Sequence, residues 1–310
     1  MSLADRGTAL TLSFRADVTE IQPGPLLSIV VVGRNDDFGG DFNARMMAAA
    51  EFNHQQLTRC GIPHEHIFVE WNPIPGKAYL ADLLIERLPW WHRRLVVDPA
   101  WHQRLSINPK LVFMEFLAKN VGIRRASGRF VLTTNTDIWL SRQVLRSLPQ
   151  LRSGILYRAV RIDLNREIGY DTMTFDVLED PESALRVNVL GRDYFANAAG
   201  DFLLLDRQTY VDLRGFNEVF RESKIHKDAN FCVHACRRGI PVEVLGTVYH
   251  IDHESSWNNV KHLYSLSHRD APFGRSDWNW EADYENPATW ALAEAPEEVR
   301  DSGLVYIGCP

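Results

Sequence analysis

The sequence has only four cysteines in 310 residues, and it contains no apolar run near the roughly 20 residues that a membrane-spanning helix needs. Cys232 and Cys236 have a CxxxC spacing, but they lie in an apparent helix beside apolar neighbours, which favours two buried thiols over a metal or redox pair. The N-terminal segment lacks the charged-then-apolar layout of a secretory signal. We therefore predict a reduced, cytoplasmic protein without a transmembrane segment.

The sequence also lacks an excess of positive charge. Its formal net charge of -6 offers no long-range attraction for a nucleic-acid backbone or an anionic membrane. No glycine-rich phosphate loop follows the first apolar strand, since Gly33-Arg34-Asn35 is too short a match, and this disfavours both a nucleotidyltransferase and a dinucleotide-dependent oxidoreductase. Nucleic acid is therefore not an expected partner, and the oligomeric state is not indicated.

The composition is that of a folded protein, with 45% hydrophobic and 24% charged residues. The length of 310 residues favours a core domain with appended elements over one large α/β domain. We expect a lead-in over residues 1–26, a core domain over 27–255 with two halves, 27–140 and 141–255, and an irregular C-terminal extension over 256–310.

Strand and helix patterns alternate in the first half of the chain. An apolar β-branched run at 27–32 predicts a buried strand, 42–58 has a helical period, and 66–71 predicts a second strand. This βαβ order indicates an α/β fold with a mostly parallel central sheet flanked by helices. Residues 72–109 are rich in proline and tryptophan, and we expect a long irregular or partly helical excursion there.

Regular patterns return after this excursion. Residues 115–128 predict a helix that ends at Gly128, and the strand 130–134 leads into Asn135-Thr136-Asp137 and a helix capped by Ser141. Further on, the patterns predict strands at 200–206 and 242–250 and helices at 208–213 and 228–238. The organisation beyond residue 255 is unclear.

The turn Asn135-Thr136-Asp137 follows a parallel strand, at the end where α/β sheets bind ligands. Asp137 could coordinate Mn²⁺ or Mg²⁺, which a donor with two adjacent phosphates needs as its diphosphate leaves, while Asn135 could hydrogen-bond ribose or water. Without companions, the same residues could equally form an Asx-turn and a helix cap.

The other candidate metal ligands and the candidate base lie in the C-terminal half of the chain. His250 ends a strand and is the preferred second metal ligand, with Asp252 and His253 as substitutes, although a lone histidine at a strand end is usually a surface residue. Asp228 begins a helix, where a carboxylate commonly stabilises the helix dipole. Alternatively, Asp228 could accept the proton of an attacking acceptor hydroxyl.

Taken in order, the segments LSIVVVGRND, KNVGIRRASGRFVLTTNTD and AAGDFLLLDRQTYVDLRGFNE resemble the GT-A glycosyltransferases, particularly the family-two-like bacterial group, over residues 27–254. The resemblance implies a GT-A fold, a metal site at Asp137 and His250, and Asp228 as the base of an inverting reaction. It also implies a UDP- or GDP-sugar donor and a saccharide or other hydroxyl acceptor. The donor-binding residues that it implies are Val32, Gly33, Arg34, Asn35, Glu70, Asn120, Arg125, Asn135, Thr136, Gly200 and Asp201.

Two residues depart from the family pattern. Asn135 replaces the first acid of the Asp-x-Asp metal motif, and Lys227 replaces the glutamate before Asp228. A catalytically silent nucleotide-sugar-binding module and a retaining glycosyltransferase therefore remain alternatives to an inverting enzyme. Several tryptophans could stack on acceptor sugars or pack in the core, namely Trp90, Trp91, Trp101, Trp257, Trp278 and Trp280.

Overall fold

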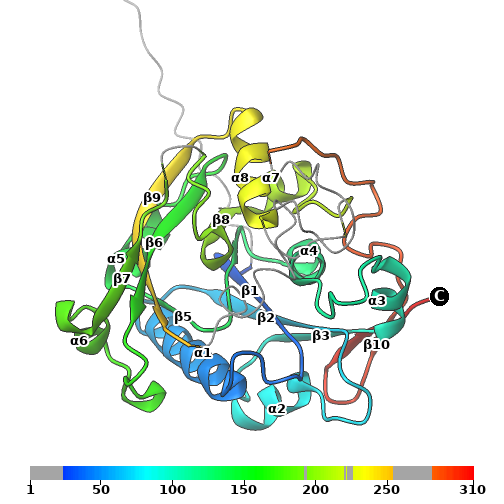
Figure 1. The fold of residues 1–310 in the computed structure, drawn as a ribbon, viewed down its shortest axis with the longest axis horizontal. Coiled ribbons are helices and arrows are strands. Elements are labelled where there is room, and N and C mark those ends of the chain that lie inside the picture. Colours follow the sequence, from blue (N-terminus) through cyan, green and yellow to red (C-terminus); the bar gives the residue numbers. More distant parts are fainter. Residues whose placement is uncertain (1–23, 192–193, 220, 222–225, 254–280) are drawn as a thin grey trace, which may run out of the picture.

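The computed structural model describes residues 24–191, 194–219, 221, 226–253 and 281–310. In these residues a mixed sheet of 11 strands runs through the middle of the molecule with helices on both faces (Figure 1). The predicted α/β class with a large central sheet flanked by helices is confirmed. None of the described helices is both long enough and apolar enough to cross a membrane.

The first half of the sheet is parallel. Strands β3 (Arg93–Val97), β2 (His64–Trp71), β1 (Leu27–Gly33) and β4 (Phe130–Thr133) lie side by side in that order, and all run in one direction. Strand β1 is buried along its whole length because helices cover both of its faces. The βαβ interpretation of the N-terminal half is therefore correct.

Beyond β4 the sheet becomes mixed. Strand β8 (Leu203–Asp206) is antiparallel to β4 and to β6 (Leu156–Leu164), and β6 is parallel to β9 (Val242–Ile251). Strands β5 (Ile138–Leu140) and β7 (Ala184–Asn188) pair antiparallel with β9 and β6. Because β6 and β9 run in the same direction as β1 and β4, the carboxyl ends of all four strands meet at one edge of the sheet.

The two largest hydrophobic clusters of the described residues form two cores, which lie on the two faces of the sheet. Alternate residues of β1 point to opposite faces: Ile29 and Val31 belong to the first core, and Val30 and Val32 belong to the second. Helices α1 (Phe42–Arg59), α2 (Leu80–Arg87) and α5 (Arg142–Ser147) pack in the first core. Helices α4 (Glu115–Arg125), α7 (Arg207–Asp212) and α8 (Lys227–Arg237) pack in the second.

The segment predicted to be irregular is more regular than expected. Residues 72–109 contain α2, strand β3 and helix α3 (Pro99–Leu105). Elsewhere, a short helix α6 (Phe175–Leu178) lies before β7. Strand β3 is hard to identify because its apolar part, Leu95 to Val97, is short and stands among prolines and tryptophans. Tertiary pairing with β2 supplies what this local pattern lacks.

The C-terminal segment also joins the sheet. Strand β11 (Val305–Ile307) pairs parallel with β3 and antiparallel with β10 (Glu297–Val299). The described part of the expected extension therefore completes the edge of the first half of the sheet. The boundary at residue 255 stays a prediction, since residues 254–280 and the lead-in residues 1–23 lie outside the described residues.

Other predicted helix boundaries are close to the observed ones, with one exception. Ser141 caps α5 by accepting a hydrogen bond from the Val144 amide, as predicted. Helix α4, however, ends at Arg125 and not at Gly128. Gly128 does not stand after a helix in the left-handed conformation; its amide donates to Ser28 Oγ, and its backbone lies directly against β1.

This close approach predicts a large effect on stability. A Cβ atom at residue 128 would lie 2.6 Å from the Ser28 backbone nitrogen, so Gly128→Ala is expected to lower the free energy of unfolding by about 1–3 kcal/mol or more. Gly24→Ala is the matched control, because its Cβ would meet no atom closer than 3.9 Å. Urea denaturation of both variants measures the difference, and equal stability would contradict the close packing.

Candidate active site

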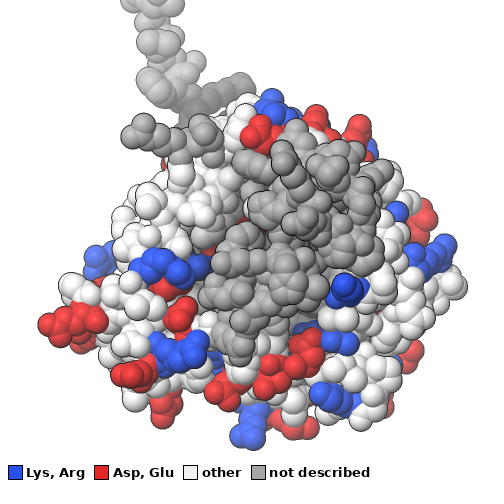
Figure 2. All heavy atoms as spheres, in the orientation of Figure 1, with Lys and Arg blue, Asp and Glu red and all other residues white. Residues whose placement is uncertain are grey.

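A pocket of about 830 Å³ opens at the edge of the sheet where β1, β4, β6 and β9 end. Its volume is in the range of small-molecule sites. Acidic and basic side chains are interspersed over the described part of the face shown in Figure 2. Most of the predicted site residues line the pocket, namely Val32, Gly33, Arg34, Asn135, Thr136, Asp137, Gly200, Asp201, Asp228, His250, Asp252 and His253.

Three of these side chains form a group that suits a metal ion. Asp137 Oδ2 lies 3.7 Å from His250 Nε2 and 3.1 Å from His253 Nε2, and the ligand atoms of all three residues lie within 4.8 Å of one another. Strand pairing brings them together, because Ile138 of β5 stands opposite His250 of β9. One carboxylate with two imidazoles fits a divalent cation, and the two imidazole nitrogens favour Mn²⁺ over Mg²⁺, the other predicted ion.

The structure selects His253 over Asp252 as the third member of this group. The period-two alternation that would place Asp252 beside His250 requires an extended chain, but β9 ends at Ile251. Asp252 still lines the pocket, and its carboxylate lies 4.0 Å from the Arg166 guanidinium.

His250 is held in place by a second carboxylate. Asp163 stands opposite His250 in the β6–β9 pairing, and its Oδ1 lies 3.1 Å from His250 Nδ1. If Nδ1 carries the proton and donates it to Asp163, Nε2 has the free lone pair that faces Asp137, which is the usual arrangement behind a metal-binding histidine. Burial lowers the pKa of His250, but the attraction of Asp137 and the Asp163 hydrogen bond outweigh it, so the pKa is raised.

A buried arginine contacts the same carboxylate. Arg45 Nε of α1 lies 3.1 Å from Asp137 Oδ2, and the guanidinium also donates to the carbonyls of Phe38, Gly39 and Gly40. Burial alone would raise the pKa of Asp137, but His250, His253 and Arg45 together hold it well below its usual value. Asp137 is therefore ionised at neutral pH.

Asn135 belongs to a polar network beside the metal-binding group. Its amide donates to Asp201 Oδ1 at 2.7 Å, and its Oδ1 accepts from Lys119 Nζ at 3.1 Å. Asp201 in turn pairs with Arg161 at 2.8 Å, and Arg161 also lies 3.0 Å from Asp163. An amide can bridge a lysine and a carboxylate in this way because it both donates and accepts. The network links the Asn135 turn to the residue that orients His250.

Asp228 lines the pocket at the N-terminus of α8. Its Oδ2 accepts a hydrogen bond of 2.7 Å from the Gly200 amide, and a Cβ at residue 200 would lie only 3.3 Å from this oxygen. Burial raises the pKa of Asp228 against the opposing effect of its two backbone hydrogen bonds. Lys227, the departure from the family pattern, is buried and donates to the Asn217 carbonyl.

Four predicted donor-binding residues lie outside the pocket lining, and two of them shape loops. Asn35 bonds the backbone of Ile74 and Ala78, and Asn120 bonds both backbone groups of Phe216. Both side chains therefore hydrogen-bond to other parts of the protein and do not extend into the pocket. The sequence pattern located the correct loops but not the direction of these side chains.

Glu70 and Arg125 are the other two predicted donor-binding residues that lie outside the pocket lining. Glu70 is fully buried, accepts from the Ala81 amide at the start of α2, and has its pKa raised to about 7 by burial. Arg125 pairs with Glu297 at 2.7 Å and donates to the carbonyls of Ala291 and Leu292. In this structure the Arg125 side chain binds the C-terminal segment, so a contact with a phosphate stays a prediction.

The described tryptophans lie outside the pocket lining. Trp91 is 4% exposed in the core, Trp101 donates to the Gly308 carbonyl, and Trp90 stacks on His54. Trp257, Trp278 and Trp280 fall outside the described residues. Trp90, Trp91 and Trp101 therefore pack within the protein, and none of them lies where it would stack on a sugar in the pocket.

Four side chains around the pocket were not predicted from the sequence: Arg45, Lys119, Arg161 and Asp163. A signal exists for three of them. Arg45 interrupts the apolar face of α1 between Phe42 and Met46, and Arg161 and Asp163 stand on one face of an apolar strand. Charged side chains on buried faces are paired or functional, so such positions indicate a site.

Comparison with known proteins gives similarity in structure only. No protein-family model matches the sequence, and the search of curated proteins found no match. The structure is similar to the catalytic domain of Drosophila β1,4-galactosyltransferase 7 in complex with xylobiose, at 11% identity over 92% of this chain and 94% of that chain, with a TM-score of 0.47.

Two further solved structures are similar at comparable levels. The mannosyltransferase PcManGT from Pyrobaculum calidifontis, in complex with GDP-Man and Mn²⁺, matches at 14% identity over 88% of this chain and 70% of that chain, with a TM-score of 0.46. S. aureus TarS 1–349 with UDP-GlcNAc matches at 15% identity over 74% and 59%, with a TM-score of 0.42. At these values the similarities assign no residue roles, which follow from the geometry of the site alone.

Proposed function

We propose that this protein is a metal-dependent glycosyltransferase that moves a sugar from a UDP- or GDP-sugar to the hydroxyl of a saccharide or other acceptor. The observation that carries the proposal is the presence in one pocket of a cation-binding group, Asp137, His250 and His253, and a carboxylate of raised pKa, Asp228. Inverting transfer from a diphosphate donor uses both functions, since charge grows on the leaving diphosphate as the acceptor loses its proton.

Asp137, His250 and His253 hold the cation in this proposal. When bound, the cation neutralises the negative charge of the donor diphosphate. Asp163 keeps the His250 ring oriented, and Arg45 keeps the Asp137 carboxylate in place through contacts at 3.1 Å each. Both supporting residues are buried, so the group is formed before any ligand arrives.

The nucleotide occupies the part of the pocket next to β1. Val32, Gly33 and Arg34 line this part together with the apolar side chains of Leu111 and Phe116. An apolar wall suits the face of a base, and backbone groups at a strand end suit its edge. The donor sugar then lies toward Gly200 and Asp201, which border Asp228.

Asp228 accepts the acceptor proton. Its hydrogen bond from the Gly200 amide fixes the carboxylate, and its raised pKa makes it a stronger base than an ordinary aspartate. Because a base of this kind serves direct displacement, the product is expected to have inverted stereochemistry at the anomeric carbon. A retaining reaction needs no such base and is the alternative mechanism.

Ligand binding tests the proposal most directly. Nucleoside diphosphates and their sugars, screened with Mn²⁺, should raise the melting temperature by roughly 5–10 °C when the ligand is about a hundredfold above its Kd. The same ligands with a chelator should produce little shift, because the diphosphate then lacks its counter-ion. No shift with any nucleotide, with or without Mn²⁺, would reject the proposal.

Turnover separates an enzyme from a silent binding module. Release of free nucleoside diphosphate from the best-binding donor, measured with Mn²⁺ and a set of saccharide acceptors, should exceed the rate without protein. Tight binding without any turnover would favour the module, in which Asn135 and Lys227 in place of the usual acids mark a lost activity.

A further inference from the structure

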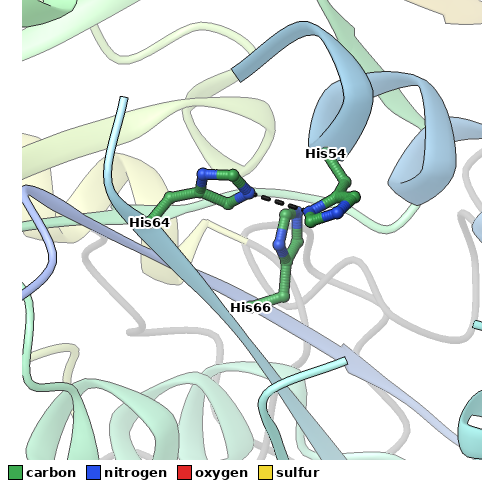
Figure 3. A group of neighbouring side chains, drawn as sticks. All are labelled: His54, His64 and His66. Carbon is green, nitrogen blue, oxygen red and sulfur yellow. Dashed lines mark hydrogen bonds between the residues drawn. The ribbon is translucent and has the colours of Figure 1, made fainter. Parts of the chain in front are cut away.

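A second group of side chains with the ligand atoms for a metal ion lies at the opposite edge of the sheet from the pocket. His54 belongs to α1, and His64 and His66 belong to the first half of β2 (Figure 3). His64 pairs with Leu27 at the start of β1, whereas the pocket lies where β1 ends. The three histidines are therefore separate from the Asp137 group and have no part in the proposed transfer.

The nitrogens of these rings converge. His54 Nδ1 lies 2.9 Å from His64 Nε2, and the ligand atoms of all three residues lie within 4.8 Å of one another. His64 and His66 share one face of β2 because they are two residues apart in a strand. Tetrahedral zinc, with Zn–N bonds of about 2.0–2.1 Å, separates two ligand nitrogens by roughly 3.4 Å, so only small movements are needed to form a common site.

His66 is the observation that points to a ligand. Its side chain is 2% exposed, and neither ring nitrogen has a hydrogen-bond partner among the described residues. A buried polar group without a partner is costly and uncommon in folded proteins. A metal ion bound by one of these nitrogens removes much of that cost.

His64 has the supporting contact that metal-binding histidines usually have. Its Nδ1 lies 2.7 Å from the Ile62 carbonyl, which can only accept, so Nδ1 carries the proton. Its Nε2 therefore has the lone pair, which accepts a hydrogen bond of 2.9 Å from His54 Nδ1; a metal ion bound between the rings would replace that hydrogen. A backbone carbonyl behind the ring fixes both the tautomer and the orientation of a ligand histidine.

Neighbouring residues hold the His54 ring in place, and one nearby histidine, His92, does not belong to the group. The Trp90 indole stacks on His54 with ring centroids 3.8 Å apart, and its Nε1 donates to Glu51 one turn before His54 in α1. His92 lies nearby, but its Nδ1 accepts from the His66 backbone amide at 3.2 Å, and it is not a member of the converging group.

We propose that His54, His64 and His66 bind a divalent transition-metal ion of the class that prefers nitrogen ligands, with Zn²⁺ as the reference ion. The group contains imidazoles and no carboxylate, so it discriminates against Mg²⁺ and Mn²⁺, which prefer oxygen. An ion bound there joins α1 to β2 and stabilises the packing of that helix on the sheet.

Zinc titration of the purified full-length protein tests this proposal. After removal of metal with a chelator, Zn²⁺ is titrated in competition with a chromophoric chelator. The Asp137→Asn variant removes the carboxylate of the other metal-binding group and weakens it, so the three histidines should be the tightest zinc site of this variant and hold one equivalent. His64→Gln in the same background should weaken that binding by more than the roughly 10–100-fold that loss of a supporting hydrogen bond costs.

His92→Gln is the matched control, because this residue adjoins the group without belonging to it. It should leave the zinc affinity within about threefold of its background, well short of the change expected for a lost ligand. Zinc binding that is absent in the Asp137→Asn background, or that is equal in the His64→Gln and His92→Gln variants, overturns the proposal.

A third variant guards against a folding defect. His66→Phe replaces the buried ring by an apolar one of similar size and removes both nitrogens that have no partner. Its metal-free melting temperature should equal or exceed that of the Asp137→Asn background, while the rise in melting temperature on addition of Zn²⁺ should disappear. An unchanged rise with Zn²⁺ in the folded variant refutes the three-histidine site.

Discussion

Replacing Asp137 by asparagine is expected to reduce sugar transfer by about 10²–10³-fold and to weaken the dependence of the rate on Mn²⁺. The change is nearly isosteric and removes only the negative charge that pairs with His250 and His253 at 3.7 and 3.1 Å. Rates measured over a Mn²⁺ titration, with circular dichroism to verify folding, give the result.

The control for this variant is Asp252→Asn. Asp252 lines the same pocket, but it faces Arg166 and lies outside the converging group. Its apparent Mn²⁺ affinity should match that of the wild type. If Asp252→Asn loses Mn²⁺ dependence and Asp137→Asn keeps it, the assignment of the ligands is incorrect.

The second large effect is expected for Asp228→Asn. The amide keeps an oxygen that can accept from the Gly200 amide, so the position of the side chain is preserved while its basicity is lost. The kcat should fall by about 10²–10⁴-fold with little change in the donor KM, because a missing base affects the chemical step and not donor binding.

The pH dependence of the wild type gives an independent signature. Asp228 acts as a base only when deprotonated, and burial raises its pKa, so kcat/KM should fall with decreasing pH at higher pH values than an ordinary aspartate would give. Asp228→Asn should lack this acidic limb. An Asp36→Asn variant, which removes another pocket carboxylate, should keep it.

The stereochemistry of the product separates the two mechanisms. If Asp228→Asn transfers sugar at the full rate, and NMR shows that the anomeric configuration of the donor is kept, the retaining alternative replaces direct displacement. Inverted product together with a slow variant supports Asp228 as the base.

Local patterns predicted the N-terminal half of the fold well. The run Leu27 to Val32 has the continuous apolar character of a strand covered on both faces, and β1 is an interior strand of the parallel part of the sheet, between β2 and β4. Strand β11 could not be predicted in this way. Its three residues are too few to show a period, and they form a strand because β3 offers an unpaired edge.

Side-chain direction at the site is the feature that the sequence did not show. Arg125 lies in a helix with a recognisable pattern, but the pattern does not show that Glu297 would pair with it from the C-terminal segment. Similarly, Glu70 at the end of β2 points to the amide of Ala81 and not to the pocket. In both cases the deciding contact comes from another segment of the chain.

By itself, the sequence determined the class of fold and the position of Asp137, because a buried strand followed by a polar turn places that turn at the ligand-binding edge of the sheet. Only the tertiary structure decided which side chains surround Asp137. The pairing of β5 with β9 and of β6 with β9 sets His250 beside Asp137 and Asp163, and α1 brings Arg45 and, at the other edge, His54. Such registers depend on the packing of the whole sheet, and no local period encodes them.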